Sequence, residues 1–214
     1  MKKSVWDILN WIVPVLLITG QLLLLAPISL NIWNGMHERR ELKKLVGFYQ
    51  LAMTDPAAAA DWAQTLEDRE ESKVRLYSVA LIWVKSDPSA AAAWAEALQD
   101  ETRKIEVLKS VAYGWVESDP SAAAAWAEAL QDETGKVEVL KSVAYGWVES
   151  DPSAAAAWAE ALQDETGKVE VLESVAYRWA RSDPSAAAAW AEALQDEETR
   201  AEVLSLLDRL NPGD

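Results

Sequence analysis

The sequence predicts an all-α protein, in which one N-terminal transmembrane helix is followed by an α-solenoid of about five helical-hairpin repeats. Three observations predict this fold. Residues 8–33 form an apolar run without a charged side chain. Asp-Pro pairs recur at a constant interval, beginning at Asp55, Asp87, Asp119, Asp151 and Asp183, and two series of tryptophans keep the same period. A fixed period of this kind is typical of stacked helical repeats.

The apolar run is long enough to span a membrane. At about 1.5 Å per residue, a helix over residues 8–33 crosses a hydrocarbon core of about 30 Å. Trp6 and Trp11 lie at one end of the run and Trp33 at the other, where indole rings favour the membrane interface. The sequence therefore predicts a single-pass anchor in the lipid bilayer.

A cleaved signal peptide is the alternative, since Lys2 and Lys3 supply a positive start. The apolar run is longer than the corresponding region of a typical signal peptide. In addition, Pro27 follows Ala26, the small residue best placed for cleavage, and we expect it to block cleavage there. Both features favour an anchor that stays in the mature protein.

A short stretch of small and polar residues lies in the middle of the run, namely Thr19, Gly20 and Gln21. One interpretation is that a single hydroxyl and a single amide are tolerated in lipid. The other is that the stretch packs on the helices of other membrane-protein subunits, because small and polar residues favour such contacts. The sequence leaves both open.

The residues that flank the run indicate its orientation. Four basic residues follow it, against Lys2 and Lys3 before it, so the positive-inside rule favours a cytoplasmic location for the repeats. The four are Arg39, Arg40, Lys43 and Lys44.

The chain is expected to divide into an anchor at 1–35, a juxtamembrane basic helix with a half-repeat at 36–54, and the solenoid at 55–214. The solenoid repeats cover residues 55–86, 87–118, 119–150, 151–182 and 183–214.

Each repeat is predicted to hold two helices. In the third repeat, Asp119 is a good N-cap and Pro120 a good first helical residue. We expect the segment 132–135 to end the first helix, so that the second helix starts at Lys136. The apolar face predicted for the first helix consists of Ala122, Trp126, Ala129 and Leu130. The second helix carries two apolar stripes, which are Val137, Leu140, Ala144 and Trp147 on one side and Val139 and Val143 on the other.

This pattern resembles the tetratricopeptide and HEAT-like class of helical-hairpin solenoids. The resemblance is one of architecture, because the period, from Asp55 to Asp87, is slightly shorter than the usual period of about 34 residues in tetratricopeptide repeats. It implies a scaffold that binds other proteins, and no binding residue is carried over from that class.

Tryptophan and glycine recur at fixed positions of the repeat. We interpret the tryptophans as core residues between hairpins, the alternative being a ladder that stacks on a ligand. Gly114 and Gly146 match Ile82 and Arg178 in other repeats, so we interpret these glycines as tolerated rather than required. The repeat tryptophans are Trp62, Trp83, Trp94, Trp115, Trp126, Trp147, Trp158, Trp179 and Trp190.

A row of tyrosine and glutamate residues on the second helices is the candidate partner-binding surface, because exposed tyrosine is favoured at protein interfaces. The alternative is an ordinary solvated helix face. We call this row the Tyr/Glu stripe, and it consists of Tyr113, Tyr145, Tyr177, Glu106, Glu117, Glu138, Glu149 and Glu170.

Charge and composition exclude several function classes. The net charge of the 214-residue chain is −15. The segment 1–54 holds six basic and three acidic side chains, so the remainder of the chain carries −18. A surface this acidic repels nucleic acid and favours a basic protein partner. The absence of cysteine excludes disulfides and thiolate chemistry.

No residues indicate an enzyme, a cofactor site or a metal site. His37 is the only histidine, and no phosphate-binding loop or dinucleotide motif is present. The expected function is that of an accessory subunit that braces a larger membrane complex of the photosynthetic, respiratory or secretion type. The alternative is a membrane-tethered module that recruits a soluble basic protein or peptide.

Overall fold

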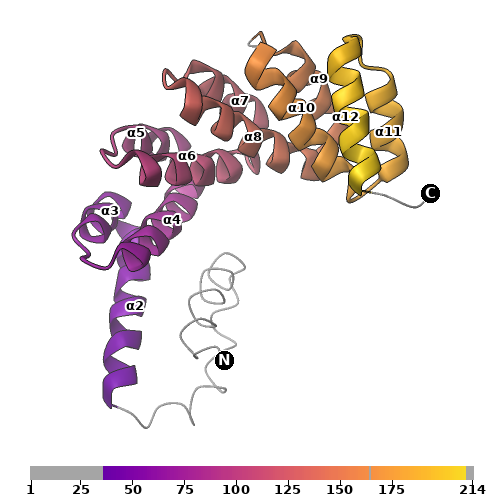
Figure 1. Ribbon diagram of the computed structural model, residues 1–214. Helices are drawn as coiled ribbons and strands as arrows, with labels where there is room; N and C mark the ends of the chain where they lie inside the picture. Colours follow the sequence, from indigo (N-terminus) through magenta and orange to yellow (C-terminus); the bar gives the residue numbers. More distant parts are fainter. Residues whose placement is uncertain (1–35, 164, 211–214) are drawn as a thin grey trace. The chain divides into compact units, whose positions relative to one another are not determined.

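The computed structural model describes residues 36–163 and 165–210, and within them it confirms an all-α fold with no strand (Figure 1). Eleven helices cover this part of the chain. Short first helices, which start at regular intervals, alternate with longer second helices. The first helices are α3 (Pro56–Gln64), α5 (Pro88–Glu96), α7 (Pro120–Ala129), α9 (Pro152–Ala161) and α11 (Pro184–Glu192). The others are α2 (Met36–Thr54), α4 (Arg69–Ser86), α6 (Glu101–Val116), α8 (Glu133–Ser150), α10 (Glu165–Ala180) and α12 (Glu197–Leu210).

The chain forms two compact units, Met1–Trp83 and Val84–Asp214. In the described part of the first unit, α2 packs on α3 through the ring of Phe48, whose centroid lies 5.4 Å from that of Trp62. The hydroxyl groups of Tyr49 and Ser78 lie 3.4 Å apart and link α2 to α4. All the functional surfaces described below belong to the second unit.

First helices begin as predicted. The Asp119 side chain accepts a hydrogen bond of 2.9 Å from the Ala122 backbone N–H, and Pro120 occupies the first helical position. The same cap recurs at Asp55, Asp87, Asp151 and Asp183.

The predicted break between the two helices is wrong by about one turn. Helix α8 begins at Glu133, before the expected Lys136, because the Asp132 side chain accepts a hydrogen bond of 3.0 Å from the Gly135 N–H and caps the helix. Gly135 therefore lies in the first helical turn, where a backbone N–H has no partner within the helix and needs a cap.

The buried face of the first helices also differs from the prediction. In α7 the buried residues are Ala123, Ala124, Ala127 and Leu130. Of the residues predicted for this face, Ala129 is exposed, and Ala122 and Trp126 are half-buried. Helix α7 contacts both α6 and α8, and α9 contacts both α8 and α10. The face that α7 buries therefore consists mainly of small alanine side chains, and the large indole of Trp126 is only half-buried.

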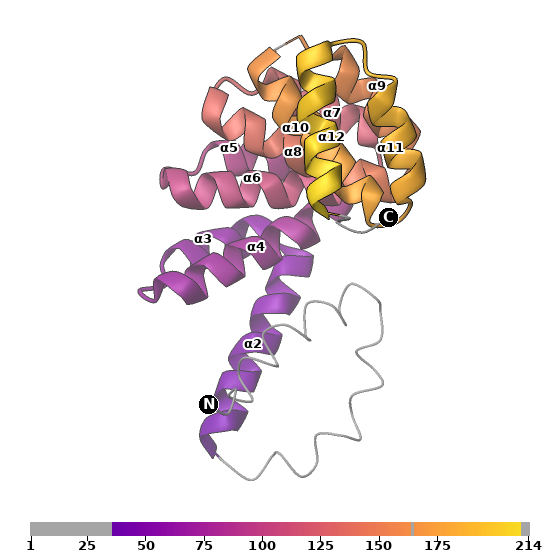
Figure 2. The ribbon, with the colours of Figure 1, turned by 45° about the vertical axis from the view of Figure 1, so that its right-hand side comes forward.

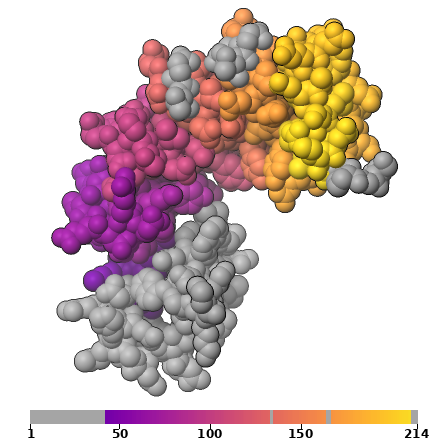
Figure 3. Space-filling model, viewed as in Figure 1, coloured from indigo at the N-terminus to yellow at the C-terminus, as the bar shows by residue number. Residues whose placement is uncertain are grey.

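Second helices pack against one another in chain order, α6 on α8, α8 on α10 and α10 on α12, as Figures 1 and 2 show. In α8, Val139, Leu140, Val143 and Ala144 are buried, which confirms the core of both predicted stripes. The repeats of the second unit thus follow one another as successive bands in the space-filling view (Figure 3). This arrangement is compatible with a helical repeat architecture.

Gly114 is required rather than merely tolerated, whereas Gly146 lies in tight contact that a small movement of its neighbours would relieve. A Cβ atom built on Gly114 lies 2.5 Å from Cγ1 of Val84, and one on Gly146 lies 3.3 Å from both Tyr113 and Val116. The missing side chain of Gly114 allows the close approach of Val84, and the comparison with Ile82 and Arg178 in other repeats could not show this role.

The anchor prediction lies outside the described residues. Residues 8–33 are not among them, and over the stretches 36–163 and 165–210 no helix combines the length and the apolar character of a membrane span. Trp6, Trp11, Trp33, Thr19, Gly20 and Gln21 lie outside as well. Lys43 and Lys44 are exposed on α2, while Arg39 and Arg40 lie on the same helix.

Candidate functional site: two repeated side-chain rows

The predicted Tyr/Glu stripe lies on three successive second helices, α6, α8 and α10. Tyr113 and Tyr145 are half-buried and Tyr177 is 37% exposed, so the rings lie at the surface with part of each ring packed against neighbours. Burial raises the pKa of Tyr113, and the nearby Glu149 carboxylate raises it further. The Tyr113 hydroxyl is therefore neutral and donates a hydrogen bond of 3.3 Å to Glu149.

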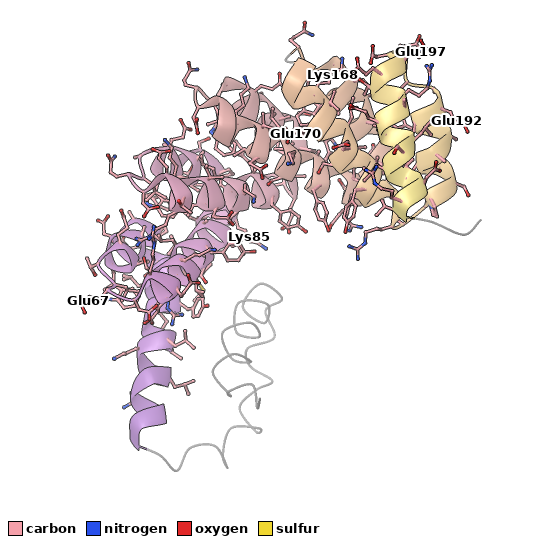
Figure 4. The ribbon with its side chains drawn as sticks, in the orientation of Figure 1. Glu67, Lys85, Lys168, Glu170, Glu192 and Glu197 are labelled. Atoms are coloured by element: carbon pink, nitrogen blue, oxygen red, sulfur yellow. The ribbon has the colours of Figure 1, made fainter. Side chains whose placement is uncertain are left out.

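Every glutamate of the stripe has a basic partner. Lys109 lies between Glu106 of its own helix and Glu138 of the next, with distances of 3.3 and 3.7 Å. Lys141 repeats this arrangement between Glu138 and Glu170, at 2.9 and 3.1 Å. Glu117 pairs with Lys85 at 3.6 Å, and Glu149 pairs with Arg178 at 2.7 Å. Figure 4 shows Lys85 and Glu170 among these side chains.

The ion pairs shift the titration of the charged groups toward their ionised forms. The hydrogen bond from Lys141 lowers the pKa of Glu138, and the same bond raises the pKa of Lys141. The stripe is therefore a chain of alternating charges held between helices. It is less acidic than its glutamates alone suggest.

Arg178 lies at the end of the stripe, on its third helix, α10. It occupies the position that Gly114 and Gly146 hold in other repeats. Its guanidinium reaches back to Glu149 and lies 5.2 Å from the centroid of the Tyr145 ring. Glu149 therefore accepts from Tyr113 on α6 and Arg178 on α10, which joins three helices through one carboxylate.

A second repeated row, which sequence analysis missed, joins tryptophans to glutamates of the first helices. The Trp115 and Trp126 rings lie 5.6 Å apart between centroids, and the indole N–H of Trp126 donates a hydrogen bond of 2.8 Å to Glu96. We call such a set a Trp/Glu cradle. The second cradle consists of Glu128, Trp147 and Trp158, and the third of Glu160, Trp179 and Trp190, with the same hydrogen bond of 2.8 Å.

The cradles correct the interpretation of the tryptophans as core residues for all but one of them, because among the nine only Trp179, which is 9% exposed, belongs to the buried core. Trp126 and its counterparts Trp158 and Trp190 are half-buried, and Trp62 in the first unit is 38% exposed. The sequence did hold a signal for the cradles, because the tryptophan of α5, α7, α9 and α11 is followed two positions later by a glutamate. That glutamate bonds, however, to the tryptophan of the next repeat, and only the structure shows this contact.

Neither row holds a metal site, since among the described residues no three acidic or histidine side chains lie close enough together to ligate an ion. No protein-family model, curated protein or solved structure matches the chain.

Proposed function

We propose that this chain is a membrane-anchored scaffold, an accessory subunit that braces a larger membrane complex of the photosynthetic, respiratory or secretion type. The observation that carries the proposal is the continuity of the Tyr/Glu stripe. Its residues recur on α6, α8 and α10, and Lys109 and Lys141 tie each helix to the next by ion pairs. A surface held in this way is pre-organised, so a partner that docks on it has less side-chain ordering to overcome.

The stripe has the composition of a docking surface. Its tyrosines offer large rings with polar tips, which are favoured at interfaces, and its charges are balanced locally. A flat contact with a folded subunit suits such a surface better than capture of a strongly charged ligand does.

The anchor supplies the other half of the proposal. In this proposal residues 8–33 are the membrane anchor, and Thr19, Gly20 and Gln21 are the candidate contact with the helices of other membrane subunits. The basic residues of α2 keep the repeats on the cytoplasmic side. The scaffold is thereby attached to the complex at two places, one in the membrane and one outside it.

Extraction in mild detergent tests this function. A structural subunit comigrates with one large complex in fixed stoichiometry on native electrophoresis. We expect the variant with Tyr113→Ser, Tyr145→Ser and Tyr177→Ser to remain in the membrane but to leave the complex more readily.

Tyr77→Ser is the matched control, because Tyr77 is 48% exposed and lies outside the stripe. Wild-type protein that runs free of any large complex would contradict the brace. If the wild type comigrates and the triple variant does so equally well, the stripe is not the docking surface.

A membrane-tethered recruitment module is the second candidate. It is favoured by the charge of −18 over residues 55–214, which steers a soluble basic protein or peptide toward the repeats. Such a module would run largely free after extraction and would bind its partner more weakly as the salt concentration rises.

A further inference from the structure

The first helices of the second unit carry acidic side chains and no basic ones. Helices α5, α7, α9 and α11 contain no lysine or arginine, whereas each contains one glutamate and is capped by an aspartate. Three of these glutamates, Glu96, Glu128 and Glu160, belong to the cradles.

The cradle glutamates differ from those of the stripe in their partners. Each accepts one indole N–H through Oε1, and across the described residues none of the three forms an ion pair. All three are exposed to solvent beside a half-buried indole ring. Each cradle thus presents a negative charge at the N–H edge of a half-buried indole, at the same position of three consecutive repeats.

We propose that the Trp/Glu cradles bind arginine side chains of a basic protein segment. A guanidinium stacks on an indole face and is attracted by the ring electrons. The same planar group donates hydrogen bonds to a carboxylate, which are stronger than bonds between neutral groups. The indole N–H fixes the rotamer of each glutamate, so the carboxylate is already placed beside the ring.

Repetition adds avidity to this chemistry. One arginine in one cradle binds weakly, because the site is open to solvent. A segment that carries several arginines engages more than one cradle, and each further contact forms at high effective concentration. The cradles thus select an arginine-rich segment over a single cationic residue.

This inference deepens the proposed scaffold function, since it names a second surface and the chemistry of what it takes. The binding of arginine by the cradles does not depend on the scaffold function, and only the role of this binding in the cell rests on it. Binding to purified protein can fail while comigration with a membrane complex succeeds, and the reverse, so the two tests separate the two proposals.

The experiment measures fluorescence anisotropy of a labelled peptide, with arginines spaced by glycine and serine, against the full-length protein in a neutral detergent. The test variant is Glu96→Gln with Glu128→Gln and Glu160→Gln. Glutamine retains an oxygen that accepts the indole N–H, so the fold is preserved, and circular dichroism checks this. The control variant, Glu67→Gln with Glu192→Gln and Glu198→Gln, removes the same charge from exposed glutamates outside the cradles. Figure 4 shows Glu67 and Glu192, from the first and the last of the described repeats.

We expect the cradle variant to lose about ten-fold in affinity for the arginine peptide and the control to lose about two-fold or less. A peptide with lysine in place of arginine should bind more weakly to wild-type protein, because ammonium groups stack poorly. The arginine peptide, unlike one with glutamine at these positions, should also protect wild-type tryptophan fluorescence from acrylamide quenching.

Three results would overturn the proposal. The first is wild-type protein that fails to bind the arginine peptide at low salt. The second is an equal loss of affinity in the two triple variants, which would show a diffuse acidic field. The third is unchanged quenching of tryptophan in the bound state, a measurement on wild-type protein that does not depend on how the variants fold.

Discussion

Lys141 on α8 bridges two helices, because its Nζ lies 2.9 Å from Oε1 of Glu138 on its own helix and 3.1 Å from Oε2 of Glu170 on α10. Lys109 makes the same bridge one repeat earlier, between α6 and α8. The matching position of the next repeat is Glu173, so this series of lysine bridges, which we call the ladder, ends at the third helix.

Lys141→Met should lower the free energy of unfolding by about 0.5–1 kcal/mol. Both ion pairs are partly exposed, and water and salt screen pairs of this kind. Urea denaturation at low and high salt measures the loss, which should shrink as salt rises. Lys168→Met is the control, since Lys168 lies on α10 (Figure 4) outside the ladder, and it should leave stability unchanged. Equal losses in the two variants would show that the bridge contributes nothing.

The loss of thermal stability at acidic pH should depend on Glu138. Its pKa in the folded protein is lowered below the ordinary value of 4.5 by the hydrogen bond from Lys141. The ionised carboxylate therefore stabilises the fold fully above pH 4.5, and this contribution disappears as the pH falls through the lower folded pKa. Glu138→Gln removes the effect, so thermal melting measured from pH 6 to pH 3 should fall less steeply in the variant. Parallel curves for variant and wild type would contradict the assignment.

Gly114→Ala should destabilise the second unit by about 1 kcal/mol, as overpacking against Val84 outweighs the better helix propensity of alanine. Gly114→Ala should cost less in a Val84→Ala background than in the wild type, because Val84→Ala, although itself destabilising, removes the atom that the new methyl group meets.

Gly47→Ala is the matched control, because nothing lies within 4 Å of a Cβ built on this helical glycine. It should stabilise the protein by up to about 1 kcal/mol through helix propensity alone. Chemical denaturation compares the four variants, Gly114→Ala, Val84→Ala, the double variant and Gly47→Ala. A stabilising Gly114→Ala would show that the approach of Val84 to α6 is not tight.

Much of the fold was predictable from the sequence because its signals are local. Asp119 and Pro120 mark a helix start by their own chemistry, and the pattern of Val139, Leu140 and Val143 marks a buried second helix. The constant period then extends one hairpin to the whole array.

The remaining features depend on contacts between repeats. A run of alanines has no apolar contrast, so no pattern in Ala122–Ala125 shows which side is buried. The role of Gly114 is set by Val84 in the preceding repeat, and that of Glu96 by Trp126 in the following one. Comparison of the repeats identified the residues of the Tyr/Glu stripe, but it could not show that basic side chains neutralise the glutamates of the stripe.

Deletion of one complete repeat, Asp119 to Ser150, should leave a folded and shorter protein. The deletion joins Ser118 to Asp151, restores the Ser-Asp-Pro junction, and lets α9 occupy the place of α7. Circular dichroism should show the same helicity per residue, with cooperative unfolding at somewhat lower stability.

The control for this deletion removes α7 alone, from Asp119 to Gln131. It leaves α6 and α8 without the helix that packs against both, and it should unfold at far lower temperature. If both deletions are equally damaging, the repeats do not behave as modules.

Photo-crosslinking from Tyr177 in cells tests the scaffold function most directly. Tyr177 is the most exposed tyrosine of the stripe, and p-benzoylphenylalanine in its place reacts only with groups in contact. The scaffold function predicts one discrete adduct, in the membrane fraction, with a subunit of a large membrane complex, and no such adduct when the same group replaces Tyr77. The absence of an adduct at Tyr177, or the same adducts from both positions, would contradict it.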